Sequence, residues 1–323
     1  ITLFISNFKL MNSITIKHIF KTLFLILIIS FLADKLIFFA LNKISDKVFT
    51  GQSIGKLNQY LQVKDTTEFI VYGSSRANHN INTTMISKSS FNMGMDGRDL
   101  AYPATLIKLL PKDKKQVILL HIEPKNAFAT DYIGNDIQVL SSKYNRNKII
   151  KNEIDNLNQE NVLQNFYWSL SYNGKVLGIL NNYLKPSYNY KNYFGYDPIY
   201  VNENQRKIFK EILKRDDSVI DCKDQYVLNK IYDNYLDELS LFCKENKKTF
   251  ILFTSPEFDD KCKDDNIKLS QILKDRNLKY YDLSDYFKED NKLEYWKDLG
   301  HLSNVGADLF TEKIKILLKT EVQ

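Results

Sequence analysis

The sequence has few cysteines and few arginines, and each shortage excludes a class of protein. Its 323 residues include three cysteines, Cys222, Cys243 and Cys262, which lie far apart and form no CxxC pair. A disulfide-stapled scaffold and a zinc ribbon are therefore excluded, while pairing of two of the three cysteines stays open. Only six of the 45 basic residues are arginine. Because proteins that read nucleic-acid grooves rely on the arginine fork, no nucleic-acid partner is expected.

Glycine and proline are also scarce, at 11 and 6 residues, which excludes collagen-like and low-complexity chains. Hydrophobic residues make up 44% of the chain and charged residues 26%, as in a globular protein. The length fits two domains, or one large domain with attachments. No cysteines and histidines are paired at metal-ligand spacing, and neither a metal ion nor a cofactor is expected.

The longest apolar stretch lies near the N-terminus, at residues 19–41. Its uninterrupted part, 23–33, is too short alone to cross a hydrocarbon core of ~30 Å, but the whole stretch is long enough. Lysines precede it, so the positive-inside rule places residues 1–18 in the cytoplasm and the rest of the chain outside. The absence of a following A-x-A-like site favours a single-pass signal anchor in the cell membrane over a cleaved signal peptide. A buried amphipathic helix is the remaining alternative.

The rest of the chain alternates apolar runs with helical patterns. Near-continuous β-branched or aromatic runs are typical of strands buried on both faces of a parallel sheet. The expected strands occupy residues 68–75, 91–95, 116–124, 249–256 and 279–287. We therefore predict a juxtamembrane linker or helix over 42–66, followed over 67–323 by an α/β domain. It would be a three-layer α/β/α sandwich with a mostly parallel sheet, and functional side chains would gather at the carboxyl ends of its strands.

An insertion at about 126–224 interrupts this alternation. A crossover between parallel strands needs only about a dozen residues, so this segment is extra material. Its middle, residues 165–200, holds eight tyrosines and Trp168. These aromatic side chains would form a platform for sugar rings, or they would simply pack a small subdomain.

Three short segments contain residues suited to acyl chemistry. In the first, Gly73-Ser74-Ser75 follows a strand, and a helix N-terminus there would favour negative charge developing near a serine hydroxyl. An ordinary serine N-cap is the alternative. In the second, Gly94 allows close backbone approach, and its N–H can point at an oxyanion beside the first segment. The alternative there is an ordinary strand–helix turn with Asp99 as the helix cap.

The third segment contains an acid and a base close together in sequence. Asp298 and His301 are three residues apart in a loop before the last predicted helix. That spacing lets the carboxylate reach Nδ1 of the imidazole and leaves Nε2 free to act as a base.

Together these segments resemble the SGNH/GDSL hydrolase superfamily, over about residues 68–319 with the insertion excepted. The family's Gly-Asp-Ser block resembles Gly73-Ser74-Ser75, with serine in place of aspartate, and its D-x-x-H block resembles the segment Asp298 to His301. The resemblance implies a flavodoxin-like fold, a Ser75–His301–Asp298 triad, and an oxyanion hole formed by the N–H groups of Ser75 and Gly94. The third oxyanion donor of the family comes from a Gly-x-Asn-Asp block, for which this chain offers only Asn126.

Two arginines lie inside the motif segments, Arg76 and Arg98. They would clamp an anionic group of the substrate, together with Trp168 as a further substrate contact. Alternatively, they brace the fold by pairing with Asp96 or Glu123.

The predicted function is that of a membrane-anchored extracytoplasmic acyl-ester enzyme, an O-acyltransferase or esterase that acts on a cell-surface glycan. An outward-facing domain on a single anchor is similar to polysaccharide O-acetylation proteins and to the D-alanyl transfer protein of teichoic acids. The resemblance implies a cell-surface polysaccharide or glycan, the lipid bilayer and a multi-span membrane O-acyltransferase as partners. One alternative is a degenerate domain that binds or scaffolds glycan-modification machinery, and another is an esterase or lipase that removes acyl groups.

Overall fold

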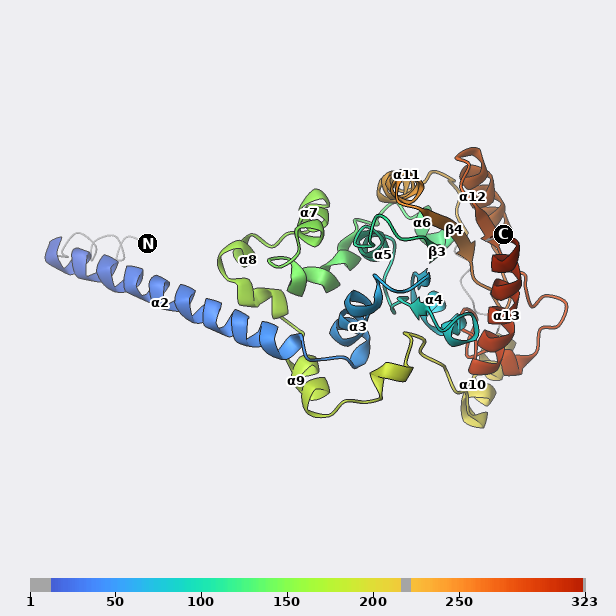
Figure 1. Cartoon of the computed structure of the whole chain (residues 1–323), viewed down its shortest axis with the longest axis horizontal. Coiled ribbons are helices and arrows are strands. Elements are labelled where there is room, and N and C mark those ends of the chain that lie inside the picture. The colour runs from blue at the N-terminus through green and yellow to red at the C-terminus, as the bar shows by residue number, and fades with distance from the viewer. Residues whose placement is uncertain (1–12, 216–221, 322–323) are drawn as a thin grey trace.

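The computed structural model describes residues 13–215 and 222–321, and it contains an α/β body from which a long N-terminal helix projects (Figure 1). Five strands form one sheet in the order β2-β1-β3-β4-β5, and every pair of neighbours is parallel. The strands are β1 (Phe69–Tyr72), β2 (Ser90–Asn92), β3 (Gln116–His121), β4 (Lys248–Thr254) and β5 (Tyr280–Asp282). Each overlaps a strand expected from the sequence, and the predicted α/β fold with a parallel sheet is confirmed.

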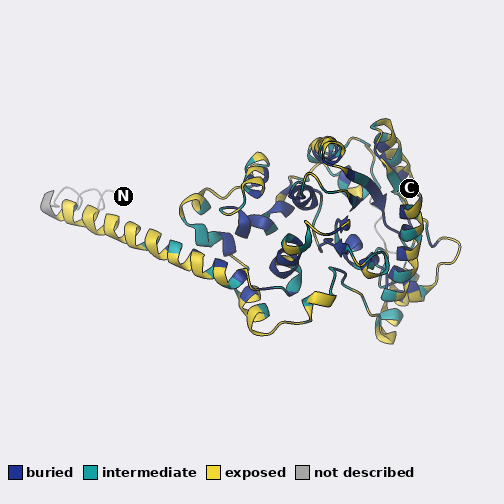
Figure 2. Ribbon diagram, in the orientation of Figure 1, coloured by how far each residue is buried: buried dark blue, intermediate teal, exposed yellow. Residues whose placement is uncertain are grey.

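Both faces of the sheet are buried, as the apolar runs predict (Figure 2). Ile70, Ile118 and Leu252 face one helical layer, whereas their neighbours in the chain face the other. The first layer contains α3 (Lys56–Val63), α5 (Ala101–Ile107), α11 (Lys230–Glu245) and α12 (Lys263–Asp275). The second contains α4 (Ser75–Asn80), α10 (Glu203–Arg215) and α13 (Asn304–Glu321). Since α3 supplies Leu57 and Tyr60 to the core, the predicted linker 42–66 is in part a layer of the body.

The projecting helix is α2 (Ser13–Ser45), which is long and apolar enough to cross a membrane. Most of its length is exposed, and only the part from Ser30 onward contacts the body (Figure 2). Phe38 and Ser45 are buried there. The predicted span 19–41 lies within α2, and residues 1–12 of the predicted cytoplasmic segment lie outside the described residues.

The predicted insertion contains short helices and, among its described residues, no strand. These helices are α6 (Pro124–Ala127), η3 (Asn135–Lys143), α7 (Lys148–Asn156), α8 (Val162–Phe166), η4 (Trp168–Tyr172), α9 (Val176–Leu184), η5 (Tyr190–Asn192) and α10. The remaining short elements are η1 (Gly51–Gly55), η2 (Thr83–Met85) and η6 (Leu293–Tyr295). Segments η4 and α9 contact α2, whereas the chain near Phe194 runs along β2, where its carbonyl accepts a 2.9 Å hydrogen bond from Asn92 N.

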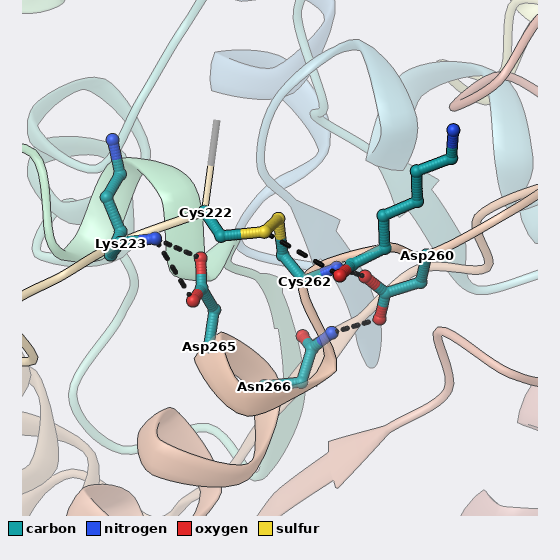
Figure 3. Close-up of a disulfide and its surroundings, with 7 residues drawn as sticks. Cys222, Lys223, Asp260, Cys262, Asp265 and Asn266 are labelled. Atoms are coloured by element: carbon teal, nitrogen blue, oxygen red, sulfur yellow. Dashed lines mark hydrogen bonds between the residues drawn. A yellow bond between two sulfur atoms is a disulfide. The ribbon is translucent and has the colours of Figure 1, made fainter. Parts of the chain in front are cut away.

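A disulfide joins Cys222 to Cys262, so two of the three cysteines pair (Figure 3). It links the end of the insertion to the residue before α12 across a sequence separation of 40. Asp265 in α12 accepts hydrogen bonds of 3.2 Å from Lys223 N, next to the disulfide (Figure 3). Cys243 is buried in the core as a free thiol.

Candidate active site

The structure brings Ser75, His301 and Asp298 together at the carboxyl end of the sheet. Ser75 Oγ lies 2.8 Å from His301 Nε2, although the two residues are 226 positions apart. On the other side of the ring, His301 Nδ1 lies 2.9 Å from Asp298 Oδ1 and 3.1 Å from Oδ2. These distances are those of a nucleophile, a base and an orienting acid in one hydrogen-bonded chain.

The turn from β1 into α4 presents the Ser75 hydroxyl. Gly73 has a φ of +140°, and a Cβ atom there would lie 2.6 Å from Cβ of His121, so only glycine fits. Ser74 is the N-cap of α4, and its hydroxyl accepts the N–H of Arg76 at 3.3 Å. Ser75 therefore begins the helix directly after the strand ends, as the sequence predicts.

The loop before α13 fixes the acid and the base in one orientation. Asp298 Oδ1 also accepts the backbone N–H groups of Gly300, at 3.0 Å, and of His301, at 2.9 Å. Burial would raise the pKa of Asp298, but the bonds from His301 and Gly300 outweigh it and lower the pKa to about 2. A carboxylate facing Nδ1 requires a proton on that nitrogen, which leaves Nε2 as an acceptor for the Ser75 hydroxyl.

Asn80, at the other end of α4, ties the helix to this loop. It is fully buried, and its Nδ2 donates to Ser255 Oγ at 2.8 Å and to the Gly300 carbonyl at 3.3 Å. Its Oδ1 accepts the N–H of Leu302 at 2.9 Å. These bonds hold the backbone on both sides of His301. The sequence gives no signal for this role, because Gly300 and Leu302 lie more than 200 positions from Asn80.

A second histidine–aspartate pair lies beside His301. His79 Nε2 is 3.0 Å from Asp96 Oδ1, and its Nδ1 is 2.7 Å from the Asp197 carbonyl. Both partners only accept hydrogen bonds, so His79 satisfies both of them only as an imidazolium. Burial disfavours that charge, but Asp96 and Asp197 outweigh it and raise the pKa of His79. Its ring centroid lies 5.9 Å from that of His301, which places a positive charge next to the base.

The loop after β2 is held tightly against α4. A Cβ atom on Gly94 would lie 2.5 Å from Asn78 N, so the close backbone approach expected at this glycine is present. The buried ammonium of Lys56 donates to the Gly94 carbonyl at 2.6 Å and to Asn78 Oδ1 at 2.5 Å. Burial lowers the pKa of Lys56 to about 8, although Asp197 and Asp96 oppose the shift.

The predicted oxyanion role of Gly94 needs correction. Its N–H donates to Asn92 Oδ1 at 2.9 Å, and it is therefore not free to bind an oxyanion in this arrangement. The Asn92 amide in turn donates to the carbonyls of Ala77 and Ile81, both at 2.8 Å, and so ties the loop to α4. Nor does any hydrogen bond between described residues join the Asn126 side chain, on α6, to Ser75 or His301. Of the two predicted backbone donors, the Ser75 N–H is the one for which no hydrogen bond to another described group is found.

Arg76 braces the site and does not face a substrate. Its buried guanidinium donates to Glu257 Oε1 at 2.7 Å and to the Pro256 carbonyl at 2.9 Å, which ties α4 to the end of β4. Glu123 lies 3.8 Å away, so the bracing alternative holds, with Glu257 as the closer partner. Arg98 is half-buried, and its Nε has no hydrogen-bond partner among the described residues.

Trp168 does not lie at the site. It packs edge-on against Phe38 of α2, with ring centroids 5.4 Å apart, and the Lys35 ammonium lies 4.3 Å from its ring centroid. The expected substrate contact is therefore a contact with the N-terminal helix. The cause is the long insertion, whose two ends pack against different parts of the molecule.

Other tyrosines of the insertion line a cavity of about 380 Å³ beside the site. Its walls contain Tyr188, Tyr193, Tyr196, Tyr200, Asn82, Asn189, Asn192, Asn304, Asp308, Thr84 and Pro198. The cavity reaches the start of α13 at Asn304, three residues after His301, whereas Ser75, His301 and Asp298 are not among its lining residues. The hydroxyl of Tyr196 is buried and has no hydrogen-bond partner among the described residues.

Within residues 13–215 and 222–321, no group of three or more histidine, cysteine or acidic side chains could hold a metal ion. Comparison with protein-family models, with curated proteins and with solved structures finds no match for this chain. The geometry around Ser75 is therefore what supports a function.

Proposed function

We propose that this protein is a membrane-anchored serine acyl-ester enzyme of the SGNH/GDSL type. One observation carries the proposal, the hydrogen-bonded chain from Ser75 Oγ through His301 to Asp298, with links of 2.8 and 2.9 Å. The order of nucleophile, acid and base along the sequence, and their place at the carboxyl ends of parallel strands, agree with that class.

In the proposed reaction, His301 Nε2 accepts the Ser75 proton as Oγ bonds to an ester carbonyl carbon. The ester oxygen then leaves as an alcohol and takes the proton from His301, so that an acyl-serine remains. In the second half, His301 deprotonates water or a sugar hydroxyl, whose oxygen attacks the acyl carbon. The bond between the acyl group and Ser75 Oγ breaks, and Oγ takes the proton back from His301. The Ser75 N–H, in the first turn of α4, supports the oxyanion in both halves.

Placement outside the cytoplasm has two supports. The Cys222–Cys262 disulfide is typical of an oxidising compartment. The apolar helix α2 can anchor the chain in a bilayer through residues 19–41, with the N-terminus in the cytoplasm as the lysines before it favour.

The cavity beside the triad supports a sugar hydroxyl as acceptor. Tyrosine rings offer flat faces to sugar rings, and the surrounding amides and Asp308 can hydrogen-bond to hydroxyl groups. A cell-surface glycan is thus the proposed acceptor, and a multi-span membrane O-acyltransferase the proposed source of acyl groups. The second candidate function is a non-catalytic domain that binds glycan-modification machinery, and it is favoured by the engagement of the Gly94 N–H by Asn92.

A fluorophosphonate probe on the full chain in detergent tests the nucleophile. We expect labelling at Ser75, mapped by peptide mass, that is lost in Ser75→Ala and in His301→Ala. Ser53→Ala, at an exposed serine outside the site, serves as the control and should label like the parent protein. A folded parent protein that remains unlabelled would overturn the enzyme proposal and leave the binding domain as the better account.

A further inference from the structure

A carboxylate within α2, that of Asp34, follows the longest apolar run of the helix and is covered by the insertion. Asp34 is 5% exposed, and its two oxygens accept the backbone N–H groups of Trp168, at 2.8 Å, and Ser169, at 2.9 Å. Lys35 Nζ donates to the same carboxylate at 2.9 Å. A charged group with these protein partners belongs to the body, so the lipid-facing part of α2 would end just before Asp34, short of the predicted end at residue 41. Three exposed apolar side chains would then lie at the membrane surface, those of Leu36, Ile37 and Phe39.

The remaining length matches a bilayer. Residues 15–33 of α2, at about 1.5 Å rise per residue, extend for about 28 Å, close to the ~30 Å of a hydrocarbon core. Side chains along this part, such as Phe24 and Leu27, are exposed. The membrane surface would then cross α2 near Asp34, the level at which the insertion docks.

A corner of the insertion lies at this same level. We call it the α8 corner, formed by Val162, Leu163, Phe166 and Tyr167. Tyr167 Oη is 3.2 Å from Ser30 Oγ, and the Phe166 carbonyl accepts a hydrogen bond from Lys35 Nζ. Figure 1 shows α8 beside α2, on the side of the body from which the helix projects.

The α8 corner exposes its apolar side chains instead of burying them. Val162 is 66% exposed, Leu163 59% and Phe166 60%, on a helix of only five residues. Because these three side chains lie beside the end of the lipid-facing segment, lipid at the membrane surface would cover them. The Lys35 ammonium, which pairs with Asp34, also lies over the rings of Phe31 and Trp168, at 4.3 Å from each centroid.

We propose that the α8 corner inserts into the interfacial layer of the bilayer that α2 crosses. Aromatic and apolar side chains at the end of a span partition into this layer, where rings reach lipid and polar tips reach headgroups. The body is then attached at two points, the helix and the corner, which fixes its tilt relative to the membrane. The inference depends on α2 crossing a bilayer, but not on the chemistry at Ser75.

The test places an environment-sensitive NBD fluorophore on the full chain through Leu163→Cys. Ile208→Cys provides the matched control, because Ile208 is also 60% exposed and lies on α10, away from α2 (Figure 1). The native disulfide stays intact, and the parent protein reports any labelling of Cys243. Both variants are reconstituted in phosphatidylcholine–phosphatidylglycerol vesicles that contain lipids with a spin label near the headgroup.

We expect spin-labelled lipid to quench the fluorophore at 163 several-fold more than at 208, with blue-shifted emission at 163. Equal quenching at the two positions would overturn the proposal. Since the vesicles contain no other protein, an unquenched probe at 163 would assign the corner to a protein partner instead. Fluorophosphonate labelling of Ser75 in the same samples reports separately on the enzyme proposal.

Discussion

Two sets of groups surround the Ser75 hydroxyl, those for proton transfer and those for the oxyanion, and only the first set is in place for the proposed reaction. On the proton-transfer side, His301 and Asp298 are aligned, and Asn80 holds the loop that carries them. On the oxyanion side, the Gly94 N–H already donates to Asn92. The comparison indicates that the acid–base machinery is built into the fold, whereas a second oxyanion donor requires Asn92 to release a peptide N–H. One missing donor corresponds to a loss of about 10²–10³ in turnover.

The largest loss of labelling rate is expected from Asp298→Asn, on the proton-transfer side. An amide can face Nδ1 with its oxygen or its nitrogen, and the wrong orientation leaves Nε2 protonated and unable to accept from Ser75. Fluorophosphonate acylation should slow by about 10⁴-fold while the fold is retained. Asp264→Asn, at an exposed aspartate on α12, should leave the rate unchanged. If the rate changed little in Asp298→Asn, the proton-transfer side would not be what makes Ser75 reactive.

A pair of buried asparagines gives the most direct test of the comparison. Asn80→Ala loosens the His301 loop, whereas Asn92→Ala removes the acceptor that engages the Gly94 N–H. Each substitution leaves buried groups without hydrogen-bond partners and should lower the free energy of unfolding by about 1–3 kcal/mol. Per folded molecule, acylation should slow in Asn80→Ala, by up to about 10²-fold from misplacement of the base. In Asn92→Ala it should accelerate, toward the roughly 10²-fold that one regained donor supplies.

Denaturant titration and labelling rate are measured on the same samples of both variants. Rates that fall in parallel with stability would show that the two asparagines act only on folding, and the contrast between the two sides would be lost. A faster Asn92→Ala would locate the limitation at the oxyanion.

A smaller effect, on the pH dependence of Ser75 acylation, is expected when the charge on His79 is removed. The groups near His301 are Asp298 from its own loop, His79 and Arg76 from α4, His121 at the end of β3 and Glu123 after it. Removing the His79 imidazolium in His79→Gln eases protonation of the base, so a higher pH is needed to keep Nε2 free. The midpoint of the pH–rate curve for acylation should move up by roughly two units, as Coulomb's law gives for charges ~6 Å apart near a protein surface. A midpoint that stays in place would mean that His79 is neutral.

The parts of this site that the sequence predicts are those written in local patterns. Apolar runs indicate β1 and β4, a glycine–serine turn indicates Ser75, and a three-residue spacing joins Asp298 to His301. The sequence does not predict the contacts between distant segments, because no local pattern or fixed spacing joins the two residues. His79 meets Asp197 across 118 positions, and Trp168 meets Asp34 across 134. The sequence misses the hydrogen bond of the Gly94 N–H for another reason, because the Asn92 side chain, two residues away, accepts an N–H that the motif would leave free.

The smallest change in the labelling rate of Ser75 is expected from loss of the disulfide, which belongs neither to the proton-transfer groups nor to the oxyanion groups. Replacing Cys222 and Cys262 together with serine frees a loop of 40 residues, and unfolding free energy should fall by roughly 2–4 kcal/mol. The labelling rate of the folded protein should not change measurably, because no hydrogen bond between described residues joins the pair to Ser75 or His301. Parent protein treated with reductant is the control and should unfold like the double variant. A slower labelling rate in both would instead extend the machinery on the proton-transfer side to α12, through the Asp260 carboxylate that Cys262 N contacts at 2.9 Å.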